Sequence, residues 1–184
     1  MKSNATLQKI AVPPQSLLAP SLATADFADS YLLPDPDPAR GLLQTWLELS
    51  LRTPAWMAAL MALRNRVVRL VGLKDLGGLA ARQAGKPAEA YRIGDRVGIF
   101  TLEQQRPDEL VIGDKDKHLH VRLSLLRLAL PEGGTRLALS TVVHEHNRLG
   151  RVYMWVVGPV HSLIVPLMLR QVMRRMQRDE QRGR

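Results

Sequence analysis

The sequence LHVRLSLLRLAL at residues 119–130 and the sequence TRLALSTVVHEH at residues 135–146 have the pattern of two long β-strands. Between them stands PEGG, at residues 131–134, which has the composition of a hairpin loop. Both strands are rich in leucine, valine and threonine, and both alternate over most of their length. The stretch therefore predicts an antiparallel pair of long strands.

More strands and one long helix are predicted around this hairpin. Shorter strands are expected over 96–104 and 109–113 before it and over 151–157 after it, each bounded by a turn. A glycine and a proline then begin a long apolar helix over about 158–178, with a bend expected near Pro166. Such an order suits a sheet that folds over a single helix.

The N-terminal half adds one strand and two helices. Residues 1–23 have little periodicity and predict a flexible lead-in, and 26–33 predict the first strand. The stretches 39–51 and 54–71 carry apolar residues at helical spacing. We therefore predict an α+β fold, in which a curved antiparallel sheet of about six strands surrounds a long C-terminal helix and two shorter helices follow the first strand.

The strand at 119–130 changes the phase of its alternation. Leucine and valine hold the odd positions up to Leu125, and leucine holds the even positions from Leu126. A strand with one buried face keeps a single phase unless a bulge interrupts it. We therefore predict a bulge or a sharp bend at this point.

All five histidines lie in the C-terminal half of the chain, and four of them form two His-x-His pairs. They are His118, His120, His144, His146 and His161. With the predicted bulge, His120 falls opposite His146 and Arg122 opposite His144. Two or three neighbouring imidazoles could ligate a metal ion, but the guanidinium of Arg122 would repel a cation. We predict an exposed polar strand face and no metal.

Composition excludes several classes of protein. The 184 residues suit one domain, which we place at 24–176, followed by a basic tail at 177–184. No cysteine is present, so disulfides, thiolate–metal ligation and cysteine catalysis are excluded. The formal net charge is +9, with six arginines between Arg170 and Arg184. This local charge fits a solvated helix end better than a nucleic-acid surface, because no aromatic platform accompanies it.

One segment has to be compared with a membrane span. Val152 to Leu169 is mostly apolar and lies between two arginines, but it contains a histidine, a serine and two prolines. We interpret it as a buried strand followed by a buried helix, and predict no transmembrane segment. No apolar secretory signal follows Met1, so we expect a cytoplasmic protein.

A set of short motifs stands out along the chain. The motifs are Asp108–Gly113, His118–Leu119 with Arg122, Thr141–Val143, His146–Asn147 with Leu149–Arg151, Gly158–His161 leading into Ile164–Val165, and Pro54–Trp56 with Leu63–Arg64. As a set they resemble an uncharacterised bacterial family, domain of unknown function 2867, over about residues 24–176. The resemblance implies a START-like helix-grip fold of the SRPBCC superfamily, with a cavity between sheet and helix, and no established activity. Relatives carry an acidic residue where this chain has His120.

A cavity of this kind would be lined by aromatic residues for contact area and by a few polar groups for orientation. The candidates are Trp46, Trp56, Phe100, Thr141, Trp155 and His161. Each of them also has a simpler interpretation as core, and His161 in particular lies on an apolar helix face with Val165 and Met168.

Three function classes follow. The first is binding of a small apolar or amphipathic molecule in the cavity, without a cofactor. The second is an enzyme of the same fold, cyclase-like or hydrolase-like, with His161 or Arg122 as the polar catalytic group. The third is a module that docks on a protein or membrane surface through the basic C-terminal helix. The open edges of a short sheet also leave room for a homodimer.

Overall fold

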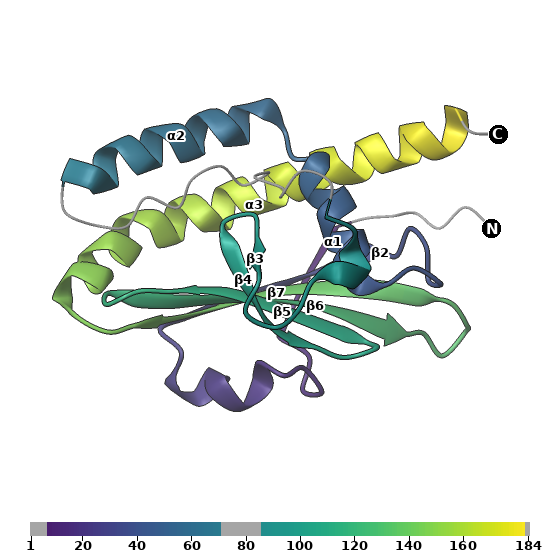
Figure 1. Cartoon of the computed structure of the whole chain (residues 1–184), viewed down its shortest axis with the longest axis horizontal. Helices are drawn as coiled ribbons and strands as arrows, with labels where there is room; N and C mark the ends of the chain where they lie inside the picture. Colours follow the sequence, from purple (N-terminus) through teal and green to yellow (C-terminus); the bar gives the residue numbers. More distant parts are fainter. Residues whose placement is uncertain (1–6, 71–85, 183–184) are drawn as a thin grey trace.

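Seven antiparallel strands form one open sheet in the computed structural model, which describes residues 7–70 and 86–182 (Figure 1). The order across the sheet is β1-β2-β7-β6-β5-β4-β3. The strands are β1 (Gln8–Ile10), β2 (Phe27–Pro34), β3 (Arg96–Val97), β4 (Phe100–Gln105), β5 (Glu109–Lys115), β6 (Leu119–Ala129) and β7 (Thr135–Glu145). The two longest strands, β6 and β7, pair along their full length, which confirms the predicted hairpin.

Helices cover both faces of the sheet, but unequally. The α-helices α1 (Leu42–Leu51), α2 (Ala55–Leu70) and α3 (Arg148–Arg182) lie on one side, and the short 3-10 helix η1 (Ala19–Thr24) lies on the other (Figure 1). A second 3-10 helix, η2 (Ala88–Ala90), precedes β3. The predicted α+β class, with two shorter helices and a long C-terminal helix, is confirmed, and the arrangement fits a helix grip with seven strands in place of six.

The predicted bulge in β6 is wrong. Its pairing with β7 runs without a shift from Leu119 opposite Glu145 to Ala129 opposite Thr135. Leu125 packs in the core under the helices, and Leu126 is buried on the other face, each with 1% of its surface exposed. The phase of the alternation changes because both faces of β6 are covered, so that apolar residues are buried at odd and at even positions. Such a strand needs no bulge.

The sheet is irregular at the other edge. The single strand predicted over 96–104 is in fact a tight hairpin, because Gly98 adopts a φ of +66° and Val97 then pairs with Phe100. A register shift between Leu102 and Gln104 makes the bulge that the sheet does contain. Glu103 is the extra residue, and its side chain is used below.

The strand predicted over 151–157 is also wrong, because α3 begins at Arg148 and continues through Pro159 and Pro166. Asn147 caps the helix by accepting a hydrogen bond from the Gly150 amide at 3.1 Å, and its own amide donates to the Lys117 carbonyl at 2.9 Å. Asn147 and Gly150 therefore start a helix and fasten it to the β5–β6 turn, where the sequence suggested a turn between strands.

α3 is long and apolar, but little of it is buried. By length and composition alone, Arg148–Arg178 could cross a membrane. Core helices of soluble proteins can be equally long and apolar, so one such helix does not identify a membrane protein. Only 17% of its most apolar 18-residue window is buried, so the interpretation of this segment as a buried strand and helix is corrected.

Residues 16–24 form a layer on the sheet and β1 joins its edge, where the sequence suggested a flexible lead-in over 1–23, of which residues 1–6 lie outside the described part of the chain. β1 pairs with β2, and Leu18 is completely buried against Val111 and Val142. The carboxylate of Glu109, 1% exposed, accepts hydrogen bonds from the Ser16 hydroxyl at 2.7 Å and the Leu17 amide at 2.8 Å. A buried carboxylate thus holds residues 16–18 on the sheet.

Candidate functional site

An aspartate lies in the apolar layer between the sheet and α3. On β2, alternate residues Phe27, Asp29, Tyr31 and Leu33 share the face toward the helices, and Tyr31 and Leu33 belong to the main core. Asp29 is 4% exposed. Neither of its carboxylate oxygens makes a hydrogen bond within the described residues. A buried carboxylate without donors is costly, which marks this position as a candidate site.

His161 of α3 meets this aspartate. Its Nε2 atom lies 3.4 Å from Oδ2 of Asp29, and the same nitrogen is buried without a hydrogen bond among the described residues. The Phe27 ring packs edge-on against the imidazole, with the ring centroids 5.3 Å apart. The side chain of His161 is 26% exposed and that of Asp29 is 1% exposed. The imidazole therefore lies between the buried carboxylate and solvent.

Two more polar side chains border the pair. Thr141 on β7 is the register partner of Asp29 and is 4% exposed. Burial raises the pKa of the Tyr31 hydroxyl, and both the adjacent charge of Asp29 and the approach of the hydroxyl to this carboxylate raise it further. Tyr31 thus keeps its proton, and the cluster offers a carboxylate, an imidazole, a phenol and a threonine hydroxyl in apolar surroundings.

The sequence named two members of this cluster, Thr141 and His161, and missed Asp29 and Tyr31. The sequence does contain a signal for Asp29. Phe27, Tyr31 and Leu33 alternate along β2 and predict its buried face, and Asp29 lies on the same face. An acidic residue at an inward strand position is unusual enough to be a lead.

The other predicted lining residues lie elsewhere. Trp46 and Phe100 pack edge to face with centroids 6.2 Å apart, at the border of the main core. The Trp56 indole donates to Gln171 on α3 at 3.0 Å. Trp155 is 80% exposed on the outer side of α3, away from the sheet. A ligand role for these four residues stays a prediction.

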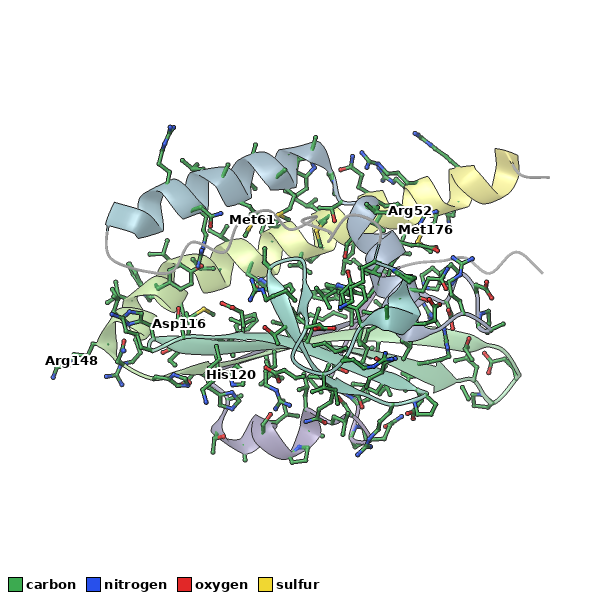
Figure 2. All side chains as sticks on the ribbon, in the orientation of Figure 1. Arg52, Met61, Asp116, His120, Arg148 and Met176 are labelled. Atoms are coloured by element: carbon green, nitrogen blue, oxygen red, sulfur yellow. The ribbon has the colours of Figure 1, made fainter. Side chains whose placement is uncertain are left out.

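The histidine pairs lie in a different register from the one predicted. His120 is opposite His144, and Arg122 is opposite Val142. Figure 2 shows His120 on the η1 side of the sheet. The described residues contain no group of three or more histidine and acidic side chains that could hold a metal ion.

Glu103 ties His120 to Arg122 on this outer face. Its carboxylate lies 2.9 Å from Nε2 of His120 and accepts a hydrogen bond from Nε of Arg122 at 3.0 Å. Burial alone would raise the pKa of Glu103, but the hydrogen bond and charge of His120, together with Arg122, bring it below its ordinary value. Gly113 makes room for this carboxylate, since a Cβ there would lie 2.2 Å from Oε1.

An open antiparallel sheet with a long C-terminal helix and a polar cluster between them defines an α+β protein with a candidate ligand site. Residues 21–168 match the family described as Protein of unknown function (DUF2867), and the chain belongs to that family. No curated protein and no solved structure matches the chain.

Proposed function

We propose that this chain is a START-like helix-grip module that binds a small amphipathic molecule between the sheet and α3. The observation that carries the proposal is Asp29, whose buried carboxylate oxygens lack hydrogen-bond donors within the described residues. A ligand that brings donors to this point would satisfy a group that is costly to leave unpaired.

The side chains around Asp29 and His161 indicate which class of ligand we expect. A carboxylate only accepts hydrogen bonds, so the polar end of the ligand should be a hydroxyl or an amine. The side chains around the pair, Phe27, Val143 and Leu139, are apolar and suit a hydrocarbon portion. Entry is expected beside His161, which is the more exposed member of the pair.

Calorimetric titration with chain-matched amphiphiles tests this assignment. Dodecanol and dodecylamine should bind the wild-type chain about tenfold more tightly than dodecanoate, because a charge-assisted hydrogen bond contributes about 1.5–3 kcal/mol and a second carboxylate would be repelled. Asp29→Asn should abolish the preference for the amine. Asp108→Asn, at an exposed aspartate, makes the same chemical change away from the site and should leave the preference intact. Equal affinity of the wild-type chain for all three amphiphiles would refute the role of Asp29.

The 3.4 Å pair also favours a second candidate, an enzyme in which Asp29 orients His161 for proton transfer. Arg122 points to the opposite face, where Glu103 holds it, so it does not join this site. Native mass spectrometry of the protein with its natural ligand separates the two candidates. A binding module returns the ligand unchanged, and His161→Gln then lowers only affinity. An enzyme returns an altered molecule, and His161→Gln then stops the alteration.

A further inference from the structure

The outer side of α3 carries a continuous apolar stripe. Its members recur every three or four residues, apart from one adjacent pair at 155 and 156, and are all exposed by 47% or more. They are Val152, Trp155, Val156, Val160, Leu163 and Leu167, which we call the α3 stripe. From Val152 to Leu167 the helix rises by about 22 Å at about 1.5 Å per residue. An exposed stripe of this size is more than a scatter of single apolar residues.

Arginines mark both ends of the α3 stripe on the same side of the helix. Arg148 lies one turn before Val152 and projects from the start of α3 (Figure 2). Arg170 and Arg174 continue the stripe after Leu167, and all three arginines are exposed. No aspartate or glutamate occurs in the sequence from His146 to Arg178. The face is therefore apolar along its middle and cationic at its ends, with no acidic residue in this part of the helix.

The neighbouring helix α2 also exposes apolar residues and lacks acidic ones. α2 runs antiparallel beside α3, since Trp56 bonds to Gln171 and Arg64 bonds to Tyr153. The sequence of α2 contains no acidic residue, and Leu60 and Leu63 are 36% and 59% exposed.

We propose that the α3 stripe docks on the surface of an anionic lipid bilayer. A bilayer interface offers an apolar layer for the valines, leucines and tryptophan and a negative surface for the arginines. Tryptophan favours this boundary because its ring is large and apolar while its N–H stays hydrated. The helix lies on the membrane and does not cross it, because its other face is built into the core through Leu169, Val172 and Met173.

The same charges argue against a second copy of this chain as the occupant. A two-fold axis through the α3 stripe would set the arginines at its ends against those of the partner, with no acidic residue of α3 before Asp179 to pair with them. An acidic bilayer has no such conflict.

Vesicle co-sedimentation of the full chain tests the proposal. The probes are vesicles of phosphatidylcholine alone and of an equimolar mixture of phosphatidylcholine and phosphatidylglycerol. Wild-type protein should sediment with the mixed vesicles and stay in solution with the neutral ones. Trp155→Ser should lower affinity about tenfold, because a large apolar side chain no longer enters the interface. Ile93→Ser removes a residue that is 68% exposed but lies outside α2 and α3, and should have no effect.

The arginines are tested separately. Each of Arg148→Gln, Arg170→Gln and Arg174→Gln should weaken binding to mixed vesicles about fivefold, as about 1 kcal/mol per basic residue implies. Arg106→Gln, at an exposed arginine of the β4–β5 turn, is the matched control. Equal binding to both vesicle types, or to neither, would overturn the proposal. So would a dimer, seen by light scattering, that Trp155→Ser dissociates, since the stripe would then be an interface between copies.

Discussion

Asp29 is the residue at which stability and the proposed function oppose each other. It places an ionisable group in the layer between sheet and helix, where every residue next to it on its face of β2 is aromatic. The fold does not need a carboxylate there, and a hydrophobic residue would suit the position better. A carboxylate that costs stability, and whose partner His161 lies 3.4 Å away without a hydrogen bond, supports the ligand site that we propose.

Asp29→Val should therefore stabilise the ligand-free protein. We expect the free energy of unfolding to rise by about 1–3 kcal/mol, because the desolvation penalty disappears. Urea denaturation of protein stripped of bound molecules measures the change. The same variant should lose binding of dodecylamine. A fall in stability would mean that the carboxylate has a structural role after all.

Glu103 predicts how stability depends on pH. Its pKa in the folded state lies below the ordinary value of 4.5, so the unfolded chain binds its proton more readily. The resulting stabilisation is complete above about pH 4.5 and is lost as the pH falls through the lower folded-state pKa. Urea denaturation as a function of pH should show this acid limb.

Glu103→Gln should flatten that limb and lower stability at neutral pH. Glu132→Gln changes an exposed glutamate in the β6–β7 loop and serves as control, with the acid limb retained. An unchanged acid limb in Glu103→Gln would show that other carboxylates dominate acid unfolding.

At the scale of elements, the start of α3 differs from the prediction, because a strand was expected where the helix begins. The stretch Arg151–Val157 is rich in valine and aromatics, which favours a strand by propensity. The helix wins because Asn147 caps it and Gly150 lets its first turn approach the β5–β6 turn. His118 joins this contact, with Nδ1 facing the Asn147 amide. These contacts involve a turn about thirty residues earlier in the sequence, so a prediction from neighbouring residues alone does not include them.

Gly150→Ala tests this contact. A Cβ at Gly150 would lie 2.3 Å from the His118 carbonyl oxygen, which is backbone and cannot move aside cheaply. We expect a loss of about 1–3 kcal/mol in the free energy of unfolding, as for other overpacked positions. Alanine would otherwise favour a helix by about 1 kcal/mol.

Gly158→Ala is the matched control on the same helix. A Cβ at Gly158 would meet nothing within 4 Å, so this variant should be neutral or slightly stabilising. Thermal denaturation of both variants measures the difference. Equal effects at the two glycines would contradict the close approach at Gly150.

At the scale of the whole molecule, the sheet is enclosed between a helical layer and an N-terminal layer. The helical layer holds the candidate ligand site, and the N-terminal layer closes the opposite face around Leu18. Glu109 fastens that second layer, because residues 16 and 17 and the Ser124 hydroxyl all donate to its carboxylate.

Glu109→Gln should release the N-terminal layer. Gln replaces one acceptor oxygen by an amide nitrogen, so at least one buried donor loses its partner, and we expect a loss of about 2 kcal/mol. Amide hydrogen exchange should speed up at Leu17 and Leu18 first. Asp108→Asn, at the neighbouring exposed residue, should leave both measurements unchanged. Slow exchange at Leu17 in Glu109→Gln would contradict the fastening role.

The sequence by itself determined the α+β class, the β6–β7 hairpin, the two early helices and the long C-terminal helix. These features follow from periodicity and turn composition within short windows, and local physics suffices for them. Thr141 and His161 were named from the sequence as candidate lining residues, and both lie beside Asp29, while their role stays a prediction.

Only the tertiary structure decided the register, the start of α3 and the partners at the site. His120 meets His144, and His161 meets Asp29, through pairings of segments far apart in the chain. Register depends on which faces are covered, and the second face of the sheet is covered by N-terminal residues, which meet β5 and β7 through Leu18 and β6 through Ser16 and carry no periodic signal. Contacts of this kind arise from the packing of the whole chain, so no local pattern could specify them.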